Sequence, residues 1–344
     1  MSTSVKRREF ITLLGGAAAW PARRRFLRLA AGTAVFTLPA RRATAQNYPN
    51  RFVRMIVPFP PGGGMDPVAR PLANRLSEIW GQSVVIENKG GGGSNIGTLA
   101  AAQSAPDGYT LLMVAPSFAI NHTLYPSLGF DAVADFAPIT LVCSFPNLMT
   151  VPNSSSAISV MSFIEYAKAN RGRITFASSG IGTAPHLAGE LFKRMAGIEM
   201  THVPYRGAGP ALNDLIPGRV DVMFGTMPSM LPQVSSRTLR GLAVTSAARS
   251  PFAAELPTIA ESGLPGFDVS TWYALFVPAR TPKEIVRKIH DDTAAALADP
   301  SVQQRFAEMG AVVVTSTPGE LGAYLKREID KWAPIIKEAG IKPE

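Results

Sequence analysis

The sequence contains a single cysteine, Cys143, among its 344 residues. One thiol excludes an intramolecular disulfide bond and any metal centre made of several cysteines. Cys143 lies in the apolar run LVCSF, which predicts a small buried side chain. The histidines are also scattered, and His122, His202 and His290 show no spacing that would join them to His186 in one site. We therefore predict no metal and no cofactor.

Common motifs of enzyme active sites are absent as well. The sequence has no G-x-S-x-G, no G-x-x-x-x-G-K-[ST] and no H-E-x-x-H. The pairs Gly180-x-Gly182 and Gly207-x-Gly209 lack the third glycine of a dinucleotide-binding loop. Lys89 precedes its glycines, which is the wrong order for a phosphate loop. We therefore predict that the protein is not an enzyme.

Basic residues exceed acidic ones, 34 to 25, but the excess is confined to one end of the chain. Residues 1–45 hold nine basic residues and one acid, Glu9, which leaves 25 basic and 24 acidic residues in the remainder. A nearly neutral body lacks the basic surface that binding to phosphate backbones needs. Nucleic acid is therefore excluded as a partner.

No apolar run in residues 1–45 reaches the length of about 20 residues that a membrane-spanning helix needs. Arg7-Arg8 precedes ITLLGGAAAW, and Arg24-Arg25 precedes LAAGTAVFTLPA, so the segment is typical of two export signals in tandem. Paired arginines before a short apolar stretch favour a twin-arginine signal, with an ordinary secretory signal as the alternative. Ala43-Thr44-Ala45 predicts cleavage near Ala45, and no cysteine follows that could carry a lipid anchor.

From Phe52 onward, short β-rich runs alternate with amphipathic helical patterns. This alternation is typical of an α/β fold with parallel strands. The runs NLMTVP and FDVSTWYALFVPA are expected to carry the chain out of a first lobe and back into it. We predict two lobes, each a mixed sheet flanked by helices, with residues 46–147 and 270–344 in lobe 1 and residues 148–269 in lobe 2.

Three predicted strands run into a glycine-containing turn that leads into a helix with an early proline. The turns are Gly62-Gly63-Gly64-Met65-Asp66-Pro67, residues 178–185, and Gly207-Ala208-Gly209-Pro210, and residues 90–94 form a fourth glycine-rich turn. Proline is tolerated at the first helical position, and glycine lets a ligand approach the backbone closely. The unpaired N–H groups at such helix starts bind anions without Arg or Lys. Because these turns follow the carboxyl ends of strands, we expect them to face one cleft between the lobes.

Two side chains next to these turns are candidates for a role in the cleft. Asp66 precedes Pro67 and is expected to cap its helix, with ligand contact as a compatible second role. His186 lies in the first turn of its helix, from which it can reach the cleft.

Five stretches of the chain, in order, resemble Bug-type periplasmic receptors of tripartite tricarboxylate transporters. They are VPFPPGGGMDPVAR, VVIENKGGGGSNIGTLAAAQSAPDGYTLL, ASSGIGTAPHLAGELFK, HVPYRGAGPALNDLIPGRVDVMF and LPTIAESGLPGFDVSTWYALFVPA. The resemblance covers essentially the whole chain after residue 45. It implies the two-lobed periplasmic-binding-protein (Venus flytrap) architecture. In such receptors one ligand carboxylate is held mainly by loop backbone groups and bridging waters.

The ligand contacts that the resemblance implies come from both lobes. Those of lobe 1 are Phe59, Pro60, Pro61, Gly62, Gly63, Gly64, Asp66, Asn95 and Ser117. Those of lobe 2 are Ser178, Ser179, Gly182, Thr183, His186, Tyr205, Arg206, Gly207 and Ala208, with Asp221 near the rim. Two positions depart from the family pattern and bear on the shape of the pocket. Pro60 stands where alanine is frequent, and Gly225 stands where a more polar residue is expected.

We therefore predict a periplasmic receptor that captures a small organic carboxylate, such as a tricarboxylate or a dicarboxylate. Its partners are expected to be the membrane subunits of a tripartite tricarboxylate transporter, and the receptor itself is expected to be a monomer. Two alternatives stay open at this point. One is a sensory subunit that presents its ligand to a membrane kinase, and the other is an exported hydrolase or isomerase that uses Asp66, His186 or Asp221.

Overall fold

The computed structural model describes residues 48–338 and 340–343, which belong to one compact unit, Thr44–Glu344. The predicted export signal and its cleavage site near Ala45 lie outside the described residues. In the part of the chain that is described, no helix is both long and apolar enough to cross a membrane.

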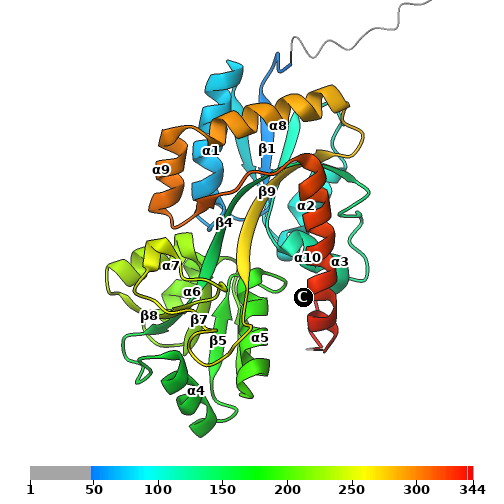
Figure 1. Ribbon diagram of the computed structural model, residues 1–344. Helices are drawn as coiled ribbons and strands as arrows, with labels where there is room; N and C mark the ends of the chain where they lie inside the picture. The colour runs from blue at the N-terminus through cyan, green and yellow to red at the C-terminus, as the bar shows by residue number, and fades with distance from the viewer. Residues whose placement is uncertain (1–47, 339, 344) are drawn as a thin grey trace, which may run out of the picture. The chain divides into compact units, whose positions relative to one another are not determined.

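The strands form two connected groups, which Figure 1 shows above and below one another. Their bounds are β1 (Val53–Val57), β2 (Val84–Asn88), β3 (Thr110–Val114), β4 (Phe136–Pro152), β5 (Thr175–Ser178), β6 (Thr201–Pro204), β7 (Val222–Thr226), β8 (Leu239–Val244), β9 (Ser270–Pro278) and β10 (Val312–Val313). In the first sheet the order is β2-β1-β3-β9-β4, with β1 parallel to β2 and β3, and β9 antiparallel to both of its neighbours. The short β10 pairs antiparallel with Cys143 and Ser144 of β4.

The second sheet has β5 in parallel between β6 and β7, and β4 pairs antiparallel with β7 and β8. The long strand β4 therefore belongs to both sheets. Its residues 136–146 pair with β9, and its residues 147–152 pair with β7 and β8. The chain passes from the first sheet to the second within this strand.

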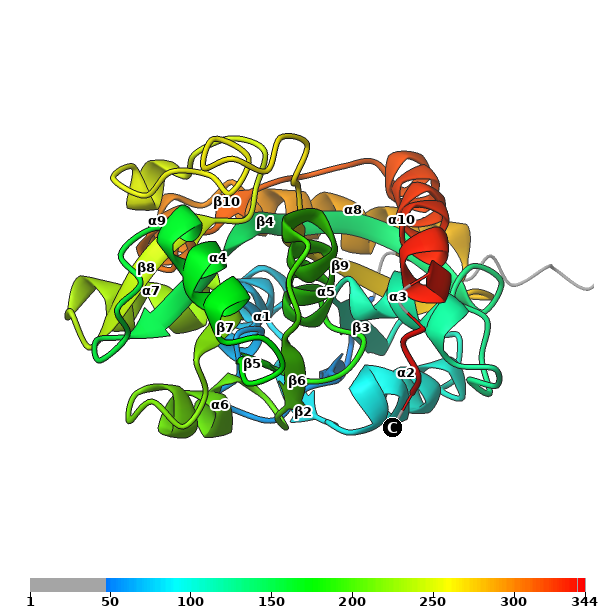
Figure 2. The same cartoon turned by 90° about the horizontal axis from the view of Figure 1, so that it is seen from below.

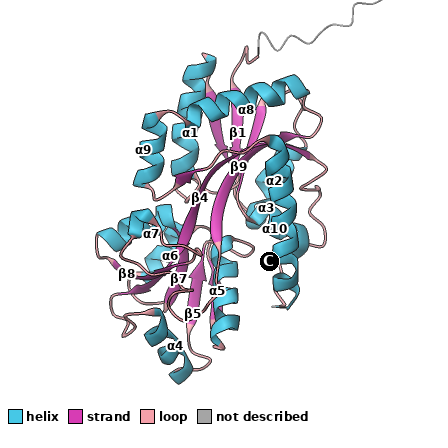
Figure 3. Ribbon diagram, in the orientation of Figure 1, coloured by secondary structure: helices cyan, strands magenta, loops and turns pink. Residues whose placement is uncertain are grey.

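Helices cover both faces of each sheet, as the colouring in Figure 3 makes plain. Their bounds are α1 (Asp66–Trp80), α2 (Asn95–Ala102), α3 (Ser117–Leu124), α4 (Val160–Ala169), α5 (Ala184–Ala196), α6 (Ala208–Leu215), α7 (Met227–Ser235), α8 (Lys283–Leu297), α9 (Pro300–Glu308) and α10 (Pro318–Glu338). In the first sheet α1, α8 and α9 share one core, and α2, α3 and α10 lie on the other face. In the second sheet α4 and α5 share one core, and α6 and α7 lie on the other face.

The alternation of side chains along each strand explains why the strands are apolar throughout. In β1, Met55 and Val57 pack toward α1, whereas Ile56 packs toward α2 and α3. In β5, Phe176 packs toward α5 and Ala177 packs toward α6. All five side chains are fully buried. A strand with helices on both faces has no solvent side, so its sequence shows a continuous apolar run.

The C-terminal helix α10 reaches two of these cores. Leu321 and Leu325 near its start pack with residues of the first sheet, whereas Trp332 and Ile336 near its end pack in the core that contains Phe192 of α5. Figures 1 and 2 both place α10 beside α3. The assignment of residues 46–147 and 270–344 to lobe 1, and of residues 148–269 to lobe 2, stays our proposal.

The α/β class and the two-lobed architecture are confirmed, and the detail differs in two ways. The run NLMTVP, expected to carry the chain out of the first lobe, is not a strand of its own but the end of the long strand β4, which begins at Phe136. The helices α3, α7 and α9 are not predicted from the sequence. Nearly all of α3 is buried, which removes the amphipathic pattern, and α7 contains prolines near its start and in its interior.

Candidate functional site

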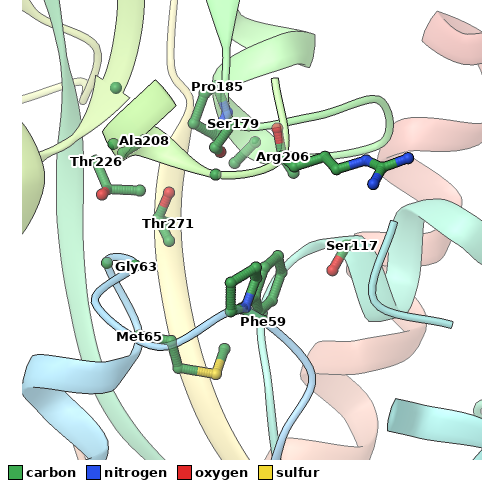
Figure 4. Close-up of a pocket in the computed structure, with 18 of the residues that line it drawn as sticks. Phe59, Gly63, Met65, Ser117, Ser179, Pro185, Arg206, Ala208, Thr226 and Thr271 are labelled. Atoms are coloured by element: carbon green, nitrogen blue, oxygen red, sulfur yellow. The ribbon is translucent and has the colours of Figure 1, made fainter. Parts of the chain in front are cut away.

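A cavity of about 310 Å³ lies where three of the glycine turns meet. The loops after β1, β5 and β6 bound it, together with parts of β7 and β9 (Figure 4). The lining residues are Phe59, Pro60, Pro61, Gly62, Gly63, Gly64, Met65, Ala115, Pro116, Ser117, Ser179, Thr183, Ala184, Pro185, Arg206, Gly207, Ala208, Gly209, Pro210, Met223, Gly225, Thr226, Thr271 and Tyr273. Of the described residues that line it, Arg206 is the only one with a charged side chain.

The cavity brings together more than half of the predicted contacts. Those that line it are Phe59, Pro60, Pro61, Gly62, Gly63, Gly64, Ser117, Ser179, Thr183, Arg206, Gly207 and Ala208. Those that do not are Asp66, Asn95, Ser178, Gly182, His186, Tyr205 and Asp221. Most of the second group lie behind the lining loops and hydrogen-bond to other protein groups.

Asp66 is the first residue of α1, and the residue before it takes the cap position without a side-chain hydrogen bond. The predicted capping role is therefore wrong. The buried carboxylate accepts hydrogen bonds from the Gly62 N–H (3.4 Å), the Arg70 guanidinium (2.8 Å) and the Asn88 amide (3.1 Å). The Asn88 amide also donates to the Phe59 carbonyl (3.1 Å). Asp66 and Asn88 together fix the glycine loop after β1.

Fewer backbone N–H groups are free for a ligand than the sequence indicates. The turn N–H groups that donate to protein acceptors are those of Gly62, Gly63, Gly180, Gly182, Thr183 and Gly207. Among the residues that line the cavity, the turn N–H groups with no acceptor in the described part of the chain are those of Gly64, Met65, Ser179, Ala184, Ala208 and Gly209. Except for Ser179, which directly follows β5, the second group stands at or just before the starts of α1, α5 and α6, where the helix dipoles are positive. These positions form the anion-binding part of the site.

His186 lies behind the loop after β5, and His202 from β6 stacks on it with ring centroids 4.0 Å apart. The prediction that these two histidines are unrelated is wrong. The Gly182 N–H donates to His186 Nδ1 (3.2 Å), and the Ser178 hydroxyl lies 2.7 Å from His202 Nε2. Burial, with the nearby charge of Lys193 as the second cause, lowers the pKa of His202 to about 4. Burial also lowers the pKa of His186 far below its usual range, so both rings are neutral near pH 7.

Three other predicted contacts bind protein groups instead of facing the cavity. The Tyr205 hydroxyl donates to Asp214 (2.8 Å), and the side-chain oxygen of Asn95 accepts from an amide of α3 (2.8 Å). The Asp221 carboxylate accepts from the N–H and the hydroxyl of Thr175, both at 2.8 Å. Asp221 and Thr175 stand at the starts of β7 and β5, whereas the cavity lies at the ends of these strands. The predicted position of Asp221 near the rim is therefore wrong.

The sequence gives no signal for three polar lining residues that come from strands. Thr226 ends β7, and Thr271 and Tyr273 belong to β9. The Thr271 hydroxyl donates to the side-chain oxygen of Asn147 (2.7 Å), and the hydroxyls of Thr226 and Ser229 are 3.1 Å apart. Only the long-range pairing of β4 with β7 and β9 brings these residues beside the glycine loops.

The described residues contain no group of three or more His, Cys, Asp or Glu side chains that could hold a metal ion. The chemistry of the cavity therefore consists of backbone N–H donors, a few hydroxyl groups, one guanidinium and apolar walls.

The chain is similar to known proteins over most of its length. Residues 68–341 match the model of the tripartite tricarboxylate transporter family receptors. Protein BugT of Bordetella pertussis is 38% identical over 301 residues, which cover 87% of this chain and 92% of that protein.

Solved structures resemble it as well. The structure of R. palustris Rpa4515 with adipate has a TM-score of 0.84 and 38% identity, and the match covers 87% of this chain and 100% of that one. The structure of MatC (Rpa3494) from Rhodopseudomonas palustris with bound malate has a TM-score of 0.79 and 30% identity, with 84% and 100% covered. The periplasmic binding protein BugD gives a TM-score of 0.82 at 37% identity, with 86% and 100% covered. These matches confirm the resemblance inferred from the five sequence stretches. The chain therefore belongs to the receptor family of the tripartite tricarboxylate transporters and is a solute-binding receptor.

Proposed function

We propose that the protein is a periplasmic receptor that captures a small organic carboxylate and delivers it to the membrane subunits of a tripartite tricarboxylate transporter. In this proposal residues 1–45 direct export, cleavage occurs near Ala45, and the mature receptor is a monomer. Ligand binding favours a closed arrangement of the two lobes over an open one, because the ligand contacts loops of both.

The observation that carries the proposal is the set of unbonded N–H groups at the starts of α1, α5 and α6 around one cavity. A carboxylate can accept these hydrogen bonds, and the positive ends of the three helix dipoles favour its charge. The adipate and malate held by two similar structures support a carboxylate as the ligand class.

The side chains proposed for a hydrolase or isomerase are poorly placed for catalysis. Asp66 and His186 lie behind the loops and already hydrogen-bond to them, and Asp221 stands at the far ends of the strands. A general base has to come within hydrogen-bond reach of the reacting group. This arrangement supports capture without turnover.

Thermal unfolding against a panel of carboxylic acids tests the proposal. The protein is first unfolded and refolded to remove any ligand that it carries. An acid present at about 100 times its Kd is expected to stabilise the fold by about 2.7 kcal/mol, which raises Tm by about 5 °C. A shift with the acid but not with its amide supports the proposal, and folded protein that no acid stabilises would contradict it. Turnover of a stabilising acid would favour an enzyme.

The Gly64→Ala variant tests the site itself. A Cβ atom at Gly64 would lie 2.5 Å from the Thr226 hydroxyl, so either the Thr226 side chain or the loop has to shift, and the added methyl group occupies space in the cavity. We expect carboxylate affinity to fall at least about tenfold. Gly319→Ala in α10 is the matched control, because nothing lies within 4 Å of its Cβ position. Unchanged affinity in Gly64→Ala would place the ligand elsewhere.

A further inference from the structure

Helix α5 extends from the cavity to the end of α10. Its first residues, Ala184 and Pro185, line the cavity, and Arg194 in its last turn forms an ion pair with Glu338, the last residue of α10. At a rise of about 1.5 Å per residue, Arg194 lies about 15 Å along the helix from Ala184, so the ion pair is remote from the cavity. Over this length a helix moves as a rod. A restraint at its end therefore also restrains the start that faces a ligand.

Helix α10 is fixed to the first sheet. The buried Glu328 carboxylate accepts hydrogen bonds from the indole N–H groups of Trp272 in β9 (2.9 Å) and Trp332 in α10 (3.1 Å). Hydrogen bonds to a charged acceptor are stronger than those between neutral groups. Glu338 is therefore presented by a helix that belongs to the first sheet, whereas Arg194 belongs to a helix of the second sheet.

A second contact joins the same parts of the molecule just before α5 begins. The loop that leads into α5 passes α3 closely: a Cβ atom at Gly182 would lie 2.6 Å from Asn121 Oδ1 and 3.0 Å from the Leu124 side chain. The Asn121 amide donates to the Gly93 carbonyl (2.7 Å), which fixes the side chain on the side of the first sheet. Its Oδ1 is buried and has no hydrogen-bond partner among the described residues, so the contact with Gly182 rests on shape.

Between these two contacts the interface is apolar. The buried cluster that contains Leu187 and Phe192 of α5 also contains Leu124 of α3, and Trp332 and Ile336 of α10. Burial of apolar surface is favourable, but it has no preferred direction and does not fix the angle at which α5 lies. The contact at Gly182 and the ion pair at Arg194 define that angle, one at each end of the helix.

We propose, building on the lobe closure of the proposed function, that Arg194 and Glu338 form a clasp between the two lobes that stabilises the closed arrangement. Their side chains are 59% and 54% exposed, so the clasp is a weak, solvent-screened interaction. A weak interaction is sufficient here, because the open and closed arrangements of a binding protein differ by only a few kcal/mol. Arg194 and Glu338 are thus positioning residues, which raise the affinity without touching the ligand.

Charge reversal and charge exchange at the clasp test this proposal. The probe is adipate, or the acid with the largest thermal shift if adipate gives none, and calorimetry measures its affinity. Arg194→Glu and Glu338→Arg each bring like charges together, and we expect each to weaken binding about three- to fivefold. The double variant Arg194→Glu/Glu338→Arg pairs opposite charges again and is expected to bind within about twofold of the parent. Such a recovery is specific to an interaction between the two residues.

The kinetics separate a clasp from a direct ligand contact. The ligand enters the open arrangement, so we expect the single variants to speed up dissociation about three- to fivefold and to leave association within about twofold. Arg171→Glu is the matched control, because Arg171 and Glu199 form an exposed ion pair within lobe 2. It is expected to leave both rates within about twofold. Thermal unfolding checks that each variant is folded.

Three results would overturn the clasp and leave the receptor function standing. They are unchanged affinity in both single variants, a loss that the double variant does not reverse, and an equal loss in Arg171→Glu. Absence of binding by every acid of the panel would overturn the proposed function and the clasp together.

Discussion

The loop after β1 and the loop after β5 present backbone N–H groups to the same cavity, but they are held by different chemistry. The first is fixed by the Asp66 carboxylate, which joins the loop to Arg70 and Asn88. The second is fixed by two stacked imidazoles, His186 and His202, which are neutral near pH 7. A buried carboxylate depends on ionic and charge-assisted hydrogen bonds, whereas buried neutral rings depend on remaining unprotonated.

The comparison shows that a loop can be held in its binding conformation by a side chain behind it, while the N–H groups that face the cavity stay unbonded. In each loop the supporting side chain accepts the N–H of one glycine, Gly62 or Gly182, and the N–H groups closer to the helix, those of Gly64 and Ala184, remain without an acceptor among the described residues. The two supports should therefore be lost under different conditions. Acid protonates the histidines behind the loop after β5. The support of the loop after β1 is lost when the Asp66 carboxylate is removed, and high salt weakens only its ion pair with Arg70.

The largest expected effect is that of acid on the second loop. The unfolded chain protonates its histidines near pH 6.5, whereas His202 in the folded protein has a pKa of about 4. Stability is therefore complete above about pH 6.5 and falls as the pH drops toward 4, by on the order of 3 kcal/mol from His202 alone. Urea unfolding across this range measures it. A His202→Phe variant is expected to show a flatter pH dependence, and an identical slope in variant and parent would refute this account.

The next largest effect is expected from Asp66→Ala, which removes the support of the first loop. The Gly62 N–H and the Asn88 amide lose their acceptor, and we expect the free energy of unfolding to fall by about 2 kcal/mol at neutral pH. Denaturant unfolding gives the value, with Asp291→Ala on the exposed face of α8 as control. If both variants lose the same small amount, Asp66 does not organise the loop.

The smallest effect is expected from Arg70→Gln. The Arg70 side chain is 56% exposed, so solvent screens its 2.8 Å ion pair with Asp66 even though the Asp66 carboxylate is buried. We expect a loss below about 1 kcal/mol that shrinks further at high salt. Unfolding measured at low and high salt checks this. A loss that is large and independent of salt would show that the pair acts as a buried one.

The sequence predicts most of this fold, because the strands are continuously apolar and the glycine turns mark where they end. It predicts the lining of the cavity where the residues belong to those turns, as Gly62 and Gly207 do. It does not predict Thr226 or Tyr273, because their position depends on the register of antiparallel strands that are distant in the sequence. His202 is missed because its neighbours also depend on strand register. The parallel pairing of β6 with β5 places it opposite Phe176, and its ring stacks on that of His186.

The role of Asp66 shows a second limit. An acidic residue before Pro67 fits a helix cap, and only the position of Asn88 on the neighbouring strand shows that the carboxylate points back into the loop. Local pattern therefore locates the residue but not its hydrogen bonds.

Cys143 is fully buried, and burial raises the pKa of its thiol well above the usual range. Thiol reagents react with accessible thiolates, so we expect Cys143 to stay unmodified in the folded protein. A cysteine introduced at the exposed position of Arg206 or another residue at the edge of the cavity would then be the single site of dye attachment. The protein is thus suited to conversion into a fluorescent sensor for the acid that it binds, without removal of its native thiol.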